Sequence, residues 1–446
     1  MLAQTVAHAV LAEAGTNGLL IVAPRSFEPA LADFIAFKRR LLPTRMVALE
    51  TILQRAGGVD DPEKLKRFCY EEWHAKRLGY LLLVGDVDVL PVRFMVLDRA
   101  TAAAYDYAFY PSDLYYSDLA KADGSFDDWN GRKDSFHAGY FGEVRGEKNK
   151  EDPVNFDQIH YLPEIAVGRW PVSSAEEARQ VAAKSIAFEQ AVLTGTNAAL
   201  RRVGFVAVGG WVDSRRLLER LASKLTNEWQ VEKRFYSDTR SDSGTPPPNH
   251  EQVRGLFDAG SGLLVHTGHG QANAWEQCFS LRDLDALTNA AETPVVISAG
   301  CSTAYFAPLP PYDGYVDVTG AEHAGTDHKE VFAAPPTPPA PDPRGRFNPT
   351  GLGEQLLKRR DKGAVAYIGC NTGSQPCGLT LVEGFVTALS GRRQPRLGDC
   401  WVDAIKFYFE SEHLATLKPN NDWYPPSVFF QGMKFMVFGD PSLRMR

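Results

Sequence analysis

Short apolar runs alternate with helical patterns along most of the chain. Runs at 19–23 and 80–84 predict buried strands, and between them Leu31, Phe34 and Ile35 recur at helical spacing. An alternation of this kind is typical of a mostly parallel sheet covered by helices on both faces. The pattern therefore predicts an α/β fold.

A second series of strands and helices follows the first. Its predicted strands lie at 203–208, 262–267, 294–299, 364–368 and 433–438. A break near 192–200 separates the two series, and 446 residues are too many for one ordinary core. We expect two packed α/β subdomains, 1–197 and 198–446.

Two segments interrupt the alternation. Residues 100 to 160 are rich in Tyr, Asp, Gly and Asn, and we expect irregular excursions on the surface. The segment 305–350 shows little periodicity and contains the proline-rich run PPTPPAPDP at 335–343. A loop this long is usually functional or disordered.

Composition narrows the class of protein. The net charge of −7 argues against a nucleic-acid partner. The sequence contains no run of about 18 apolar residues, which a membrane span would need. The six cysteines are scattered and match no disulfide scaffold, and the first residues lack the basic flank of a secretory signal. We expect reduced thiols and a cytoplasmic location.

The strongest candidate chemistry lies at the ends of two strands. His269 stands between two glycines just beyond the run at 262–267, and Cys301 follows Gly300 just beyond the run at 294–299. If these strands are neighbours, both side chains emerge at one edge of the sheet. An imidazole there can accept the proton of the thiol, and the N–H groups of Gly270 and Cys301 can face an oxyanion.

Each residue alone has an ordinary explanation. A cysteine after a strand is commonly a small buried hydrophobe, and a lone histidine is easily structural. Their pairing on consecutive strand ends, each flanked by glycine, favours a Cys–His dyad without identifying the reaction.

The segment around the dyad resembles the catalytic segment of the gingipain family of cysteine peptidases. The family pattern Thr-Gly-His-Gly stands at 267–270, followed by Trp275, Leu-Thr-Asn at 287–289 and Cys301. Further matches are YLLLVGDVDVLP, SDLYY, VGRWPV, KGAVAYIG and FGDPSL. The resemblance implies a caspase-like C-terminal subdomain and peptide hydrolysis through a thioester, with His269 protonating the leaving amine.

The resemblance also implies cleavage after Arg or Lys, which depends on acidic residues after the first strand of the second subdomain. Here that segment reads GGWVD, so Asp213 is the candidate for orienting His269 or holding a basic side chain, with Glu276 as a second candidate. Thr267 and Trp275 are further candidates for substrate binding or for orienting His269. By analogy with caspases, the insert 305–350 is a candidate activation loop, with Arg344 and Arg346 as sites for an activating protease; a tolerated surface insertion is the alternative.

We expect a monomer that acts on protein or peptide substrates, with no cofactor required. Calcium bound by Asp113, Asp118 and Asp123 is a weaker expectation, since a solvated acidic loop explains the same run. Two other functions stay open: a catalytically silent caspase-like interaction module, and a hydrolase or transferase acting on a non-peptide amide.

Overall fold

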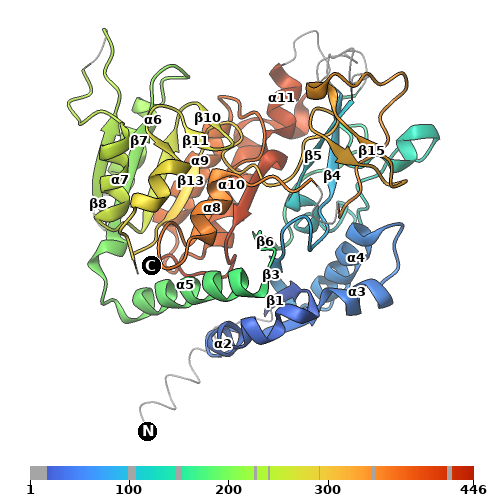
Figure 1. Ribbon diagram of the computed structural model, residues 1–446, viewed down its shortest axis with the longest axis horizontal. Coiled ribbons are helices and arrows are strands. Elements are labelled where there is room, and N and C mark those ends of the chain that lie inside the picture. Colours follow the sequence, from blue (N-terminus) through green and yellow to red (C-terminus); the bar gives the residue numbers. More distant parts are fainter. Residues whose placement is uncertain are drawn as a thin grey trace.

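One ten-stranded sheet crosses the whole molecule, in the order β2-β1-β3-β6-β17-β16-β13-β9-β7-β8 (Figure 1). The computed structural model describes residues 18–98, 107–145, 153–225, 229–239, 242–290, 292–342, 347–418 and 424–446. The strands are β1 (Gly18–Ala23), β2 (Thr44–Ala48), β3 (Leu78–Val84), β6 (Ala166–Trp170), β7 (Arg202–Ala207), β8 (Gln230–Phe235), β9 (Leu263–Thr267), β13 (Val295–Ser298), β16 (Ala366–Cys370) and β17 (Phe435–Phe438).

The sheet reverses direction once, near its middle. β16 and β17 are antiparallel, whereas every other neighbouring pair in this sheet is parallel. The strands of the second half therefore end at the edge where those of the first half begin. The expected boundary at 197/198 falls between helix α5 and β7, but the two halves share this one sheet.

Helices cover both faces of the sheet, as the alternation predicts. One face packs against α2 (Glu28–Arg39), α5 (Ala175–Thr194), α7 (His250–Asp258) and α8 (Leu352–Lys358). The other packs against α4 (Asp61–His74), α6 (Arg215–Leu225), α9 (Gly378–Gly391) and α10 (Leu397–Ser411). Successive residues of β1 enter opposite cores, which is the period-two alternation of a strand buried on both sides. Among the described helices, none is long and apolar enough to cross a bilayer.

The segment 107–145 differs from the expected surface excursion. It is irregular except for the hairpin of β4 (Phe94–Asp98) and β5 (Tyr107–Pro111), but its aromatic rings form part of the core. Tyr115, Tyr116 and Trp129 are fully buried. The Asp- and Gly-rich composition suggested a loop, whereas the aromatic residues between those positions drive the segment inward.

The insert after Cys301 lies against the N-terminal half of the molecule. In Figure 1 its orange segment, which carries β15 (Glu322–His323), runs beside β4 and β5. The N–H of Phe109 donates to the carbonyl of Pro310 over 2.6 Å, and the N–H of Val92 donates to the carbonyl of Pro341 over 3.1 Å. Between these anchors, His323 bonds to Glu330 through Nδ1 (2.8 Å) and to Asp317 through Nε2 (3.2 Å).

A buried ion cluster joins distant segments. The Nζ of Lys38 in α2 lies 2.6 Å from a carboxylate oxygen of Glu189 in α5 and 2.6 Å from one of Asp440, which follows β17. All three side chains are almost fully buried. Removing one member would leave a buried charge unpaired, so the cluster fixes the C-terminal segment against the N-terminal helices.

Candidate active site

The predicted neighbourhood of the two strands is confirmed. β9 and β13 are adjacent and parallel, with His266 paired to Ser298 as the last register pair. His269 and Cys301 each lie three residues beyond that pair, so the chain leaves both strands at the same level of the same edge. β7 flanks this pair of strands on the β9 side and β16 on the β13 side.

Glycines allow the two loops to touch. A side chain at position 270 would bring its Cβ to 2.7 Å from the carbonyl oxygen of Cys301 and 3.1 Å from its nitrogen. A Cβ at position 300 would lie 3.1 Å from the Cα of Gly270. The residue after His269 therefore packs on the backbone of Cys301, and only glycine fits between them.

The imidazole of His269 is held by a backbone carbonyl. Its Nε2 lies 2.9 Å from the oxygen of Gly210, which follows β7. A carbonyl can only accept, so Nε2 carries the proton, and in the neutral ring Nδ1 then has a free lone pair. Gly210 has φ of +94°, a conformation that favours glycine.

The thiol of Cys301 is held from the other side. Its Sγ accepts the N–H of Ser374 over 3.3 Å, in the loop after β16. Cys301 is partly exposed, whereas the other five cysteines, all of them in the described part of the chain, are buried. Burial raises the pKa of the Cys370 thiol to about 12 and also raises those of Cys69, Cys278 and Cys400.

Sequence reasoning missed both anchors, because a backbone carbonyl and a backbone N–H have no side-chain signature. The available signal was the Gly-Gly pair directly after β7, which marks a turn at the level of the site.

Two of the predicted substrate-binding residues lie in the interior. Trp275 is 1% exposed, stacks on His266 with ring centroids 4.4 Å apart, and donates from Nε1 to the hydroxyl of Tyr367. Thr267 is fully buried, and its hydroxyl bonds to Ser214 over 2.7 Å. Direct contact with a substrate is therefore excluded for Trp275 and Thr267 in this conformation, and both support the loop from within.

The two acidic candidates have other partners. Asp213 binds Arg215 through both carboxylate oxygens, at 2.9 and 3.0 Å, and this hydrogen bonding lowers the pKa of Asp213 to about 2. Glu276 accepts from the side-chain amide of Gln271 at 2.9 Å. In this structure the ring of His269 is oriented by Gly210 and not by either carboxylate.

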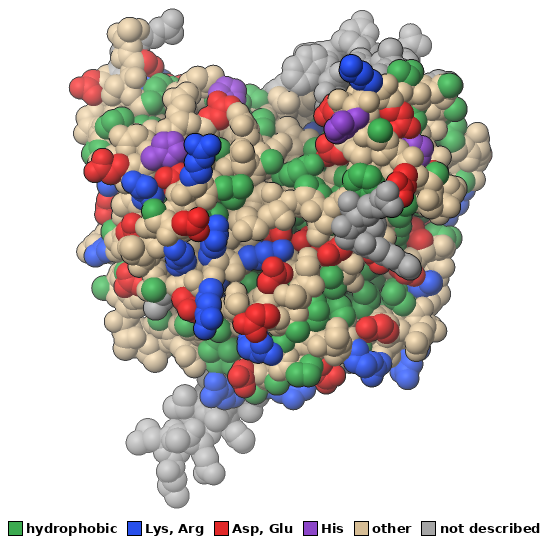
Figure 2. Space-filling view, in the orientation of Figure 1, with side chains coloured by type: hydrophobic (Ala, Val, Ile, Leu, Met, Phe, Trp, Pro, Cys, Tyr) green, Lys and Arg blue, Asp and Glu red, His purple; other side chains and the backbone are tan. Residues whose placement is uncertain are grey.

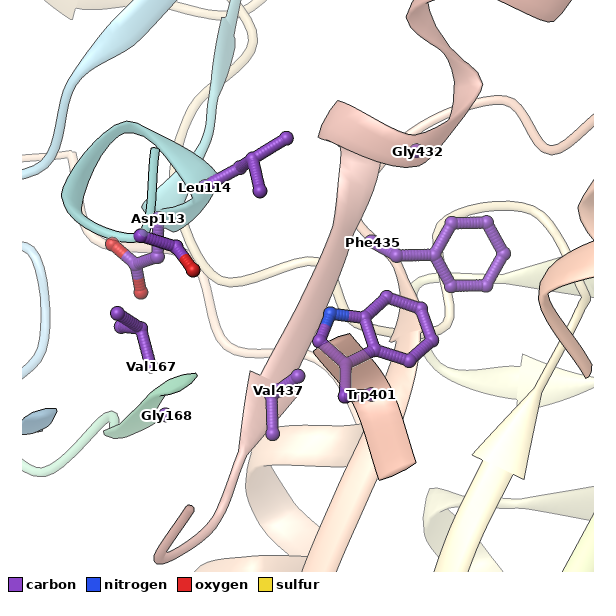
Figure 3. Close-up of a pocket in the computed structure, with 9 residues that line it drawn as sticks. Asp113, Leu114, Val167, Gly168, Trp401, Gly432, Phe435 and Val437 are labelled. Carbon is purple, nitrogen blue, oxygen red and sulfur yellow. The ribbon is translucent and has the colours of Figure 1, made fainter. Parts of the chain in front are cut away.

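The three calcium candidates do not form a common cluster in the described part of the chain. Asp113 is bound through both oxygens by Arg169, at 2.7 and 2.8 Å, beside a small pocket between η2 (Asp113–Tyr116), β6, β17 and α10 (Figure 3). Asp123 is exposed on a turn and bonds to Ser125. Asp118 is fully buried. The activation-loop candidates Arg344 and Arg346 lie outside the described residues.

The surface of the molecule carries charges of both signs. On the face shown in Figure 2, basic and acidic side chains are intermixed over the whole width of the molecule. A face of this kind offers no single-sign field for a polyanion.

A thiol and an imidazole on adjacent strand ends of a mostly parallel α/β sheet are the arrangement of a caspase-like cysteine peptidase. The chain belongs to peptidase family C25, whose family model matches residues 12–446. It is therefore a cysteine-type peptidase that acts on protein substrates. The resemblance to the gingipain family of cysteine peptidases, which the sequence motifs indicate, is confirmed.

Solved structures support the fold. A complex of the pro- and mature domains of RgpB from Porphyromonas gingivalis superposes with a TM-score of 0.63 at 17% identity, covering 96% of this chain and 79% of that one. The Arg-specific cysteine proteinase gingipain R gives a TM-score of 0.61 at 17% identity, covering 97% and 79%. A structure described only as a protease gives 0.56 at 15% identity, covering 96% and 78%. No curated protein matches the sequence.

Proposed function

We propose that this peptidase is an endopeptidase that uses Cys301 as nucleophile and His269 as acid and base. The observation that carries the proposal is the common register of β9 and β13, which ends three residues before each of the two side chains. The free lone pair at Nδ1 of His269 and the partial exposure of Cys301 give the pair the properties that the reaction needs.

In peptide hydrolysis, Cys301, His269 and one water molecule account for every bond made and every proton moved. The sulfur of Cys301 attacks the carbonyl carbon while the thiol proton passes to Nδ1 of His269, and the carbonyl electron pair moves to oxygen. Collapse of this intermediate breaks the C–N bond, the amine takes the proton from His269, and a thioester remains. Water then attacks the thioester, gives a proton to His269, and restores the thiol as the carboxylic acid leaves.

The oxyanion donors are the backbone N–H groups of Gly270 and Cys301. In the short hairpin of β10 (Gly270–Gln271) and β11 (Ala274–Trp275), the N–H of Glu276 donates to the carbonyl of His269. Hydrogen-bonded and non-bonded pairs alternate in an antiparallel ladder, so Gly270 occupies a non-bonded pair with Trp275 and its N–H points away from the hairpin. One such donor contributes roughly 100- to 1000-fold in rate.

Alkylation tests the dyad without knowledge of the substrate. Native protein treated with iodoacetamide is expected to carry the label on Cys301 alone, since the other five thiols are buried. His269→Gln is expected to slow the labelling, whereas His250→Gln, at a half-exposed histidine bonded to Asp283, serves as the matched control. Labelling that is spread over several cysteines, or unchanged by His269→Gln, contradicts the proposal and favours a silent interaction module.

We extend the proposal to a preference for Arg or Lys at the cleaved position, with Asp213 as the recognising carboxylate. The related gingipain R is named as Arg-specific. Because Arg215 occupies both oxygens of Asp213, a basic substrate side chain has to compete with it. A peptide library should show a weak basic preference that strengthens in Arg215→Ala and disappears in Asp213→Asn. Equal cleavage profiles in all three proteins exclude Asp213 as the specificity residue.

We also propose that cleavage of the insert at Arg344 or Arg346 activates the enzyme. The segments on both sides of this site are hydrogen bonded to their surroundings, through Pro341 on one side and through Asn348, which donates to Asp86 over 3.2 Å, on the other. A nicked chain would therefore stay assembled. The double variant Arg344→Ala/Arg346→Ala should remain one band on a denaturing gel and have low activity; full activity of the uncut protein overturns this part of the proposal.

The remaining parts of the proposal are a cytoplasmic, monomeric enzyme whose chemistry requires no metal. The absence of a disulfide among the six cysteines, all of which lie in the described part of the chain, supports a reducing compartment. Cell fractionation tests the location, and size-exclusion chromatography with light scattering tests the monomer.

A further inference from the structure

Three side chains from two separate segments meet in the N-terminal half. Asp118 follows η2, and His160 and Glu164 lie in the segment that leads into β6. One ligand atom from each of Asp118, His160 and Glu164 lies within 4.8 Å of the others, and these are the only three acidic, histidine or cysteine side chains in the described residues that meet in this way. The cluster is separate from the dyad, and it shares only Asp118 with the run first considered for calcium.

Asp118 lacks a partner that matches its charge. It is 0% exposed, and among the described residues neither carboxylate oxygen has a hydrogen bond within normal limits, although the N–H of Tyr161 points toward it. An unpaired buried carboxylate is costly, so a group that compensates it is expected.

The ammonium group of Lys66 does not fill this role. The Nζ of Lys66 is fully buried and has no hydrogen-bond partner among the described residues; it lies over the ring of Tyr115, 4.2 Å from the centroid. It makes no ion pair with Asp118 at 4.0 Å or less, so it offsets the charge from a distance. The carboxylate faces His160 instead, whose Nδ1 is 3.6 Å from Oδ2 of Asp118.

The other two side chains are oriented before any ion arrives. Glu164 accepts the backbone N–H groups of Leu119 and Ala120 at 2.6 and 3.2 Å with Oε2, which leaves Oε1 for a ligand. The Nδ1 of His160 accepts the N–H of Leu162 at 3.0 Å, so this nitrogen carries a lone pair and no proton. His160 is 26% exposed in its side chain, which gives an ion a path from solvent.

We propose that Asp118, His160 and Glu164 bind a divalent transition-metal ion, with Zn²⁺ as the best fit. One imidazole nitrogen and two carboxylates are a donor set suited to zinc, whereas calcium takes oxygen ligands almost exclusively. On binding, the ion replaces the Leu162 N–H at Nδ1. The site ties the segment after η2 to the segment before β6, and its role is structural.

The metal-binding experiment is best done on full-length Cys301→Ala, without an affinity tag, because Zn²⁺ also binds free thiolates. After treatment with a chelator, the protein is titrated with Zn²⁺, Mn²⁺, Ca²⁺ or Mg²⁺, and bound metal per chain is measured by mass spectrometry. We expect one Zn²⁺ per chain and a rise in melting temperature of several degrees. His160→Gln and Asp118→Asn should abolish both effects.

The matched control is Asp123→Asn, an exposed aspartate of the same loop, which should bind like the parent protein. His160 is partly exposed, so His160→Gln keeps the test informative if Asp118→Asn does not fold. Less than about one tenth of an ion per chain, or equal binding by His160→Gln, overturns the proposal, as does a response to Ca²⁺ alone. The rate of Cys301 alkylation in the parent enzyme tests the dyad independently of this result.

Discussion

At Gly270, the addition of a single methyl group should lower the catalytic rate far more than the stability of the fold. The Cβ of Gly270→Ala would lie 2.4 Å from the methyl carbon of Thr303, 2.7 Å from the carbonyl oxygen of Cys301 and 3.1 Å from its nitrogen. Ordinary contacts of this kind begin near 3.4 Å, so the Cys301 loop has to move by several tenths of an ångström or more.

The expected loss in rate is larger than the expected loss in stability. Forcing one methyl group into a packed site costs about 1–3 kcal/mol of folding free energy. A displacement approaching 1 Å between nucleophile and acid/base costs on the order of 100-fold in rate, and loss of the Gly270 N–H as an oxyanion donor costs roughly as much again. We therefore expect Gly270→Ala to lower kcat/KM by about 100-fold or more while the protein stays folded.

The assay compares three variants with the wild-type protein in two measurements. Cleavage of a library-selected peptide gives kcat/KM, and urea unfolding gives the stability. Gly270→Ala/Thr303→Ser removes the closest contact and keeps the hydroxyl that donates to Gly300, so it should recover stability but little activity. Gly255→Ala in α7 meets no atom within 4 Å and is the control. Wild-type kcat/KM in Gly270→Ala would refute the proposed packing of the site.

Three further outcomes follow from features described above. Lys38→Met leaves two buried carboxylates without their cation and should lower the unfolding free energy by about 3–5 kcal/mol, measured with urea. Burial lowers the pKa of His323, but its hydrogen bonds to Asp317 and Glu330, both within the insert, outweigh burial and raise it. The local structure of the insert is therefore stabilised below the unfolded value of about 6.5 and weakens as pH rises through the raised pKa. Limited proteolysis should cut the insert faster at pH 9 than at pH 6, and His323→Gln should remove this difference. Gly210→Ala, at φ of +94°, should cost about 1–2 kcal/mol and slow alkylation of Cys301 by moving the carbonyl that holds His269.

The buried strands, including the two that end before His269 and Cys301, were predictable from the sequence because their apolar runs are continuous. β9 and β13 begin and end within a residue of the predicted runs. The edge strands β2 and β8 were missed, because half-exposed edges carry charged residues such as those of Gln-Val-Glu-Lys-Arg-Phe.

The candidate site was likewise predictable only in part. His269 and Cys301 were found because their side chains carry the chemistry and their glycines mark the turns. A family motif does not distinguish a residue that touches substrate from one that supports the loop from inside, and the structure places the ring of Trp275 in the interior. The cluster of Asp118, His160 and Glu164 was not found as a whole, because Asp118 lies more than forty residues before the other two and only the folded chain brings them together.

The place of β17 in the sheet has a consequence for biosynthesis. This strand is the last of the sheet to leave the ribosome, yet it lies at the centre and, in the described sheet, stands between β6 and β16 and pairs with both. Until residues 435–438 emerge, each half presents an unpaired strand edge, and such edges invite pairing with other chains. A nascent or shortened chain without them should therefore depend on chaperones and aggregate readily, although its catalytic strands are already complete.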